Sequence, residues 1–200
     1  MNKIFKHIPV ICGIIFLLMI IISVGSAWAS GVHLYDLGIS FSAYVGLSRT
    51  ISAIYFCAAV VMIIMLAYYV AKTKMPLIKR IIYAVILTDL FGTAFFPYNF
   101  FSEAPTARSI NWHNNFAICM MLASTVLFII TAFTSKSKTQ RAVSIISIIY
   151  SAAFIVMYFL RFGLMFRTFF IWENLFIVLL LLAFQTEQNE NATIESETEV

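Results

Sequence analysis

The sequence predicts an all-α integral membrane protein, a bundle of six transmembrane helices with both termini in the cytoplasm. The first observation is composition: of 200 residues, 62% are hydrophobic and only 11% are charged. Soluble domains have about 45–50% apolar and about 25% charged residues. The second is that the apolar residues gather in six long runs. The third is that the lysines occur only before the first run and in alternate links between runs. A soluble fold of this size has too little interior for so much apolar surface, so the bilayer must solvate most of it.

The six apolar runs each predict one membrane-crossing helix. Such a helix needs about 20 mostly apolar residues. The links between the runs are short, except at 30–47 and 102–111. Short links favour an antiparallel bundle, so we expect residues 1–184 to form one transmembrane domain. The predicted spans are Ile8–Ala29, Ser48–Ala71, Ile81–Phe101, Trp112–Thr134, Ala142–Leu160 and Thr168–Phe184.

The first run also has features of a secretion signal. Lys3 and Lys6 precede it, and the Ala-Trp-Ala sequence at its end has the small-x-small spacing of a signal-peptidase site. Signal sequences have apolar regions of about 7–15 residues, and the run Ile8–Val24 is longer. We therefore favour a retained first span over cleavage after residue 29.

The basic residues indicate the orientation. With the N-terminus in the cytoplasm, nine of the thirteen lie inside, including all seven lysines, as the positive-inside rule requires. The net charge of +4 therefore reports topology, and we expect no nucleic-acid partner. The inner nine are Lys3, Lys6, Lys72, Lys74, Lys79, Arg80, Lys136, Lys138 and Arg141.

The last sixteen residues, 185–200, form a polar segment with several glutamates and no apolar periodicity. Segments of this composition do not bury enough apolar surface to fold. We expect a disordered acidic tail in the cytoplasm.

Ionisable residues at membrane depth are the strongest functional signals in such a chain. Asp89 lies in the middle of the third span, where a charge costs about 2.5–3.5 kcal/mol. Glu173 and His113 lie near the outer starts of the sixth and fourth spans. These three residues are the catalytic candidates. The structural alternatives are a packing hydrogen bond from Asp89 to Thr88 or Thr93, and an interfacial position for the other two.

The polar candidates all belong to the outer half of the bundle, which predicts one pocket that opens outward. We expect Arg49 and Arg161 to meet an anionic head group, because the guanidinium group suits phosphate and carboxylate. Aromatic residues would line an apolar approach: Phe95, Phe96, Phe100 and Phe101. The predicted ligand-binding residues are Asp36, Arg49, Asp89, Asn99, His113, Asn114, Arg161 and Glu173.

The sequence predicts no metal and no cofactor. His33, Asp36, His113 and Glu173 lack the spacing of a metal motif, and the two outer histidines do not indicate a haem pair. A hydrolase that uses Asp89 or Glu173 with His113 and a serine would lack a nucleophile elbow. Whether the chain is an enzyme stays open.

Four short phrases carry a resemblance to a known family. They are LYDLGISFSAYVG at 34–46, GTAFFPYN at 92–99, WHNNFA at 112–117 and WEN at 172–174. Their order resembles that in the bacterial domain-of-unknown-function 998 family, which is related to the eukaryotic FRAG/DRAM type. The resemblance implies a six-helix bundle with a retained first span. The eukaryotic relatives are associated with lipid remodelling and endomembrane processes.

These observations predict a multi-pass protein of the cell membrane, with the bacterial inner membrane as the expected site. Its outward-facing pocket would bind or process a membrane lipid or a small amphiphile. Two alternatives remain open: a small-solute transport component that needs an energising partner, and a structural membrane scaffold.

Overall fold

The computed structural model describes residues 3–29, 31, 41, 45, 48–96, 107–160 and 169–198. All regular secondary structure within these ranges is helical, which confirms the predicted all-α class. The elements in chain order are η1 (Lys3–His7), α1 (Ile8–Ala29), α3 (Arg49–Lys72), α4 (Leu77–Phe95), α5 (Ala107–Thr134), α6 (Lys138–Phe159) and α8 (Phe169–Thr198).

Five of these helices are long and apolar enough to cross a membrane, which indicates a multi-pass membrane protein. The helix α4 is not among them, since it carries three charged residues, Lys79, Arg80 and Asp89. The assignment of α4 as a sixth span therefore depends on its position in the bundle, beside the other five helices. The five apolar stretches are Phe5–Ala29, Arg49–Lys72, Asn111–Thr134, Lys138–Met157 and Phe169–Glu187.

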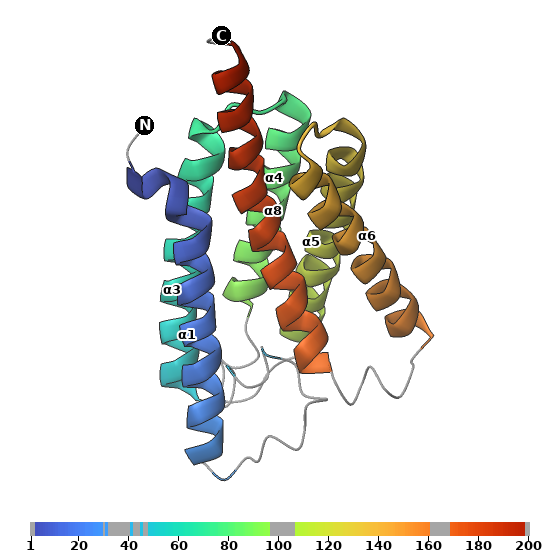
Figure 1. Ribbon diagram of the computed structural model, residues 1–200. Helices are drawn as coiled ribbons and strands as arrows, with labels where there is room; N and C mark the ends of the chain where they lie inside the picture. The colour runs from blue at the N-terminus through green and yellow to red at the C-terminus, as the bar shows by residue number, and fades with distance from the viewer. Residues whose placement is uncertain are drawn as a thin grey trace.

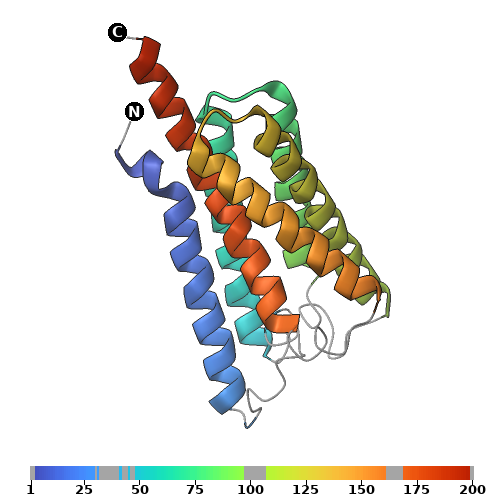
Figure 2. The same cartoon turned by 45° about the vertical axis from the view of Figure 1, so that its right-hand side comes forward.

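The six long helices form a closed ring. Each of α1, α3, α4, α5, α6 and α8 packs against its neighbour along the chain, and α8 closes the ring by packing against α1. Figures 1 and 2 show this arrangement, with α4 standing alongside the others. Short connections between antiparallel helices favour such neighbour-to-neighbour packing.

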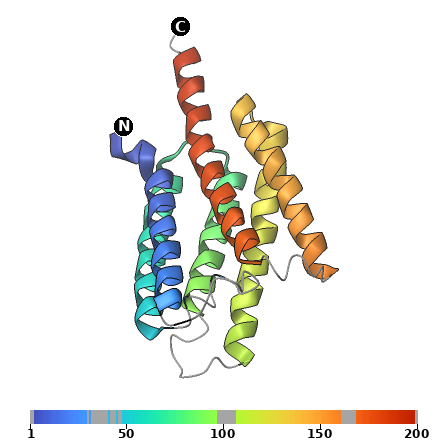
Figure 3. The same ribbon diagram turned by 60° about the horizontal axis from the view of Figure 1, so that its bottom comes forward.

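The two ends of the ring differ in charge. Both ends of the chain and the links 73–76 and 135–137 lie at the end that is uppermost in Figure 1. Lysines flank these links, so we call this the lysine-rich end and the opposite one the lysine-poor end. Figure 3 views the lysine-poor end, with α8 between α1 and α6.

The outer surface of the ring is apolar, and small polar side chains lie between the helices. Ile64 and Phe133 are 63% and 84% exposed, whereas Ser52, Ser124 and Ser147 are buried. Small hydroxyl residues let membrane helices approach closely, and lipid tails solvate the large aliphatic ones. This distribution of apolar and polar side chains agrees with the finding that five of the helices are long and apolar enough to cross a membrane.

The predicted helix boundaries agree best at α1, which begins and ends at the residues expected. The helix α4 begins at Leu77, a turn earlier than expected, because it starts directly after Pro76 and includes the Lys-Arg pair. The larger difference is at the C-terminus. The helix α8 continues to Thr198 and extends past the other helices, whereas a disordered tail was expected from Gln185 onward (Figures 1 and 2).

Candidate functional site

A cavity of about 210 Å³ is enclosed by residues from all six long helices. Most of its lining is aliphatic, aromatic or methionine, as at Met62, Ile86 and Met120. The polar lining residues share one location, the helix turns nearest the lysine-poor end: they are Tyr55, Thr93, His113, Asn114 and Glu173.

The opposite end of the cavity is closed by aromatic rings. Phe184 lines the cavity, and its ring centroid lies 4.4 Å from that of Tyr83. The hydroxyl of Tyr69 donates to the backbone oxygen of Phe184 at 2.8 Å. Glu173 and Phe184 both belong to α8, and eleven residues of helix correspond to about 16 Å. The cavity is therefore elongated. Its lining is polar at one end and apolar from there to Phe184.

Glu173 anchors part of the first long connection to the bundle. Its Oε2 accepts a hydrogen bond from the backbone N–H of Phe41 at 2.7 Å. The Phe41 side chain is buried, and its ring meets those of Phe16 and Tyr55 edge-on at 5.7 and 5.5 Å. The carboxyl group thus has one backbone donor and can accept further hydrogen bonds from a ligand, since a carboxylate has about four acceptor positions.

His113 joins α5 to the end of α4. Its Nδ1 lies 2.9 Å from the backbone oxygen of Thr93. Because a carbonyl oxygen only accepts, the bond places a proton on Nδ1. Thr93 lies in the last turn of α4, where carbonyl groups lack helical partners. His113 therefore fixes the seam between the two helices at the polar end of the cavity.

Asp89 is buried, with 8% exposure, but it does not line the cavity. Its Oδ2 has no hydrogen-bond partner among the described residues. The hydroxyl of Thr88 donates to the backbone oxygen of Ala84, and that of Thr93 donates to the backbone oxygen of Asp89. The packing bonds expected for the Asp89 carboxyl are therefore not made by these two hydroxyls.

The remaining predicted residues divide into three groups. Asn114 lines the cavity with His113 and Glu173. Arg49 is exposed at the start of α3 and is not a lining residue. The predictions for Asp36, Asn99, Arg161, His33, Phe100 and Phe101 lie outside the described residues.

The predicted aromatic approach has a different role. Phe95 and Phe96 contact each other without lining the cavity. The ring of Phe95 also meets that of Phe56 on α3 at 6.0 Å, whereas Phe96 lies on the seam of α4 with α5. Phe96 stacks on Phe116 with ring centroids 5.8 Å apart and planes 10° from parallel. The stack of Phe96 on Phe116 stabilises the helix pair that presents Thr93 and His113.

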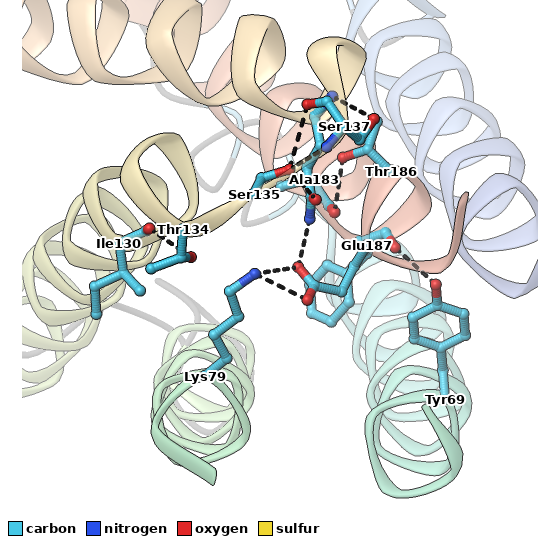
Figure 4. A network of polar contacts seen from close by, with 11 residues as sticks. Tyr69, Lys79, Ile130, Thr134, Ser135, Ser137, Ala183, Thr186 and Glu187 are labelled. Carbon is cyan, nitrogen blue, oxygen red and sulfur yellow. Dashed lines mark hydrogen bonds and ion pairs between the residues drawn. The ribbon is translucent and has the colours of Figure 1, made fainter. Parts of the chain in front are cut away.

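A second polar centre lies at the lysine-rich end, and the sequence analysis missed it (Figure 4). The Nζ of Lys79 donates to both carboxylate oxygens of Glu187, at 3.0 and 3.1 Å. Gln140 donates from Nε2 to Glu187 Oε2 at 2.6 Å, and Ser135 donates to Gln140 Oε1 at 2.7 Å. Lys79 and Glu187 are each only 3% exposed.

This buried network ties α4, α6 and α8 together, three residues beyond Phe184 on α8. The sequence analysis counted Lys79 only as one of the inner basic residues, and it assigned Glu187 to the disordered tail. One signal could have located the acid, because Glu187 continues the buried series Phe176, Leu180 and Phe184 at helical spacing. The interior of the lysine-rich end therefore contains an acid, whereas the sequence analysis placed all of its polar candidates in the outer half.

The described residues contain no group of three or more His, Cys, Asp or Glu side chains placed to hold a metal ion. No family model, no curated protein and no solved structure matches this chain. The geometry of the cavity is therefore what a functional assignment depends on.

Proposed function

We propose that this chain is a six-span protein of the cell membrane that binds a single-chain amphiphile in its central cavity. The head group would lie at the polar end, and the tail would lie between the helices. One observation supports the proposal above all: the polar lining residues gather at one end of an otherwise apolar cavity. With the lysine-rich end in the cytoplasm, the polar end faces outward.

The cavity volume limits the size of the tail. An engineered cavity of about 150 Å³ holds one benzene molecule, and pockets for drug-sized ligands occupy about 300–1,000 Å³. The volume here, about 210 Å³, lies between these values. It suits one short alkyl chain and is too small for both chains of a phospholipid.

The lining favours a head group that donates hydrogen bonds. Glu173 is the acidic lining residue, and no lysine or arginine of the described chain lines the cavity. The anionic head group expected from Arg49 is not favoured, because that side chain is exposed elsewhere. An amine or a hydroxyl group fits the carboxyl of Glu173 better.

Replacement of Glu173 by glutamine is expected to weaken alkylamine binding by about tenfold or more. A hydrogen bond to a charged group contributes about 1.5–3 kcal/mol, and about 1.4 kcal/mol corresponds to a factor of ten. Alkanols of equal length should lose less affinity. The measurement is titration calorimetry of the purified protein with butylamine, hexylamine, octylamine and decylamine and with the matching alkanols.

The length of the ligand's alkyl chain tests how far the tail extends into the cavity. Each added methylene should raise the affinity about fourfold, because it contributes about 0.8 kcal/mol, until the tail reaches Phe184. Asp89→Asn is the matched control, since this buried acid lies outside the cavity lining and its loss should leave binding unchanged. Equal binding by wild type and Glu173→Gln, or affinity that rises with length without limit, would contradict the proposal.

A further inference from the structure

We propose a second lipid site: the groove between α1 and α8 on the outer surface binds one acyl chain of an anionic lipid from the leaflet at the lysine-rich end. The groove has a volume of about 360 Å³ and is lined by α1 residues from Pro9 to Ile20 and α8 residues from Val178 to Gln185. It does not depend on the function proposed for the central cavity.

The groove faces the surroundings of the bundle. The lining residues Val10, Ile14 and Leu17 are about half exposed, at 47%, 54% and 55%. Gly13 lies in the groove with space beside it, because a Cβ at this position would make only an ordinary contact of 3.9 Å with Cδ1 of Leu181. The α1–α8 seam is also the closure of the ring, where helices distant in sequence meet.

The length of the groove matches one leaflet. From Pro9 to Ile20 there are eleven residues of helix, or about 16 Å. The hydrocarbon core of a bilayer is about 30 Å thick, so one leaflet contributes about 15 Å. An acyl chain that enters from the lysine-rich side would therefore occupy the groove along its full length.

The polar end of the groove has groups that suit an anionic head group. Gln185 lines it and donates from Nε2 to the backbone oxygen of Lys6 at 3.4 Å. The Oε1 of Gln185 is buried without a hydrogen-bond partner among the described residues. The backbone of Lys6 therefore lies beside the groove, and its exposed side chain can pair with the phosphate of an anionic lipid such as phosphatidylglycerol.

The groove and the central cavity are neighbours with a common wall. Phe16 and Leu181 line both, and both side chains are buried. A bound acyl chain would support this wall from outside without entering the cavity. The two sites can therefore be tested separately.

The test is photo-crosslinking of the full chain in vesicles that contain phosphatidylglycerol or phosphatidylcholine with a diazirine in one acyl chain. We expect phosphatidylglycerol to label the peptides of the groove at least fivefold more than phosphatidylcholine, and unlabelled phosphatidylglycerol to compete. Gly13→Phe should reduce this labelling at least fivefold, because its side chain fills the groove. Gly25→Phe is the matched control on the same helix, where nothing lies within 4 Å of a Cβ.

Lys6→Gln keeps the test valid if Gly13→Phe fails to fold. It should remove the preference for phosphatidylglycerol and leave labelling by phosphatidylcholine unchanged. Labelling that is equal for both lipids and not saturable would overturn the proposal. So would crosslinks between two copies of the chain through Ile14, since a second copy would then cover the groove. Alkylamine titration of Gly13→Phe should match wild type, which separates this site from the central cavity.

Discussion

Replacement of Glu187 by leucine is expected to lower the free energy of unfolding by about 3–5 kcal/mol, the cost of removing one partner from a buried ion pair. Lys79 would lose its ion-pair partner in a site where it is 3% exposed. Gln140 would also lose the acceptor that lies 2.6 Å from its Nε2. The measurement is equilibrium unfolding in detergent micelles, followed by circular dichroism.

A double variant separates charge balance from packing. Lys79→Met with Glu187→Leu removes both charges, and apolar replacement of a whole buried pair is often neutral or stabilising. The double variant should recover part of the lost stability and remain about 1–3 kcal/mol below wild type, because Gln140 stays unsatisfied. Lys72→Met, at an exposed lysine of the same end, is the control and should change little. Single variants that unfold like wild type would show that the pair is solvated.

The same network explains why α8 does not end where the apolar run ends. Thr186 and Glu187 are buried, so the polar sequence after Phe184 still has partners inside the bundle. Lys79 and Glu187 are 108 residues apart in the sequence. The helical spacing from Phe184 to Glu187 indicates which face of α8 the acid occupies, but nothing local indicates that Lys79 is its partner.

The fold was predictable because its signals are local. Run length and the alternation of lysines along the chain establish helix number and antiparallel order without any knowledge of packing. The bounds of α1 agree with the prediction for this reason. The packing of all six helices together determines which face of each helix points inward. The sequence pattern alone indicates that face poorly when every face of a helix is apolar.

The site was predictable in part for the same reason. His113, Asn114 and Glu173 were expected to share a pocket, and the structure brings them to one cavity. Asp89 has the greater membrane depth, yet the rotation of α4 leaves it out of the lining. Depth along a helix can be counted from the sequence, whereas rotation about the helix axis depends on contacts with α3 and α5.

Replacement of Gly92 by alanine is expected to lower the free energy of unfolding by about 1–3 kcal/mol, the usual cost of overpacking. A Cβ at Gly92 would lie 2.6 Å from Cδ2 of Phe116, closer than real contacts allow. The ring of Phe116 cannot easily retreat, because it stacks on Phe96 at 5.8 Å and packs beside Trp112 at 6.1 Å. The measurement is the same unfolding experiment in micelles.

Gly25→Ala is the matched control, because the helix there has open space for a Cβ. Alanine is the better helix former by about 1 kcal/mol, so this variant should be neutral or more stable. Adding Phe116→Leu to Gly92→Ala should restore part of the loss, whereas a loss that persists unchanged would place its cause elsewhere. Gly92 directly precedes Thr93, whose backbone oxygen holds His113 at 2.9 Å. Separating α4 from α5 would therefore displace the polar end of the cavity, and the variant should bind alkylamines more weakly even where it remains folded.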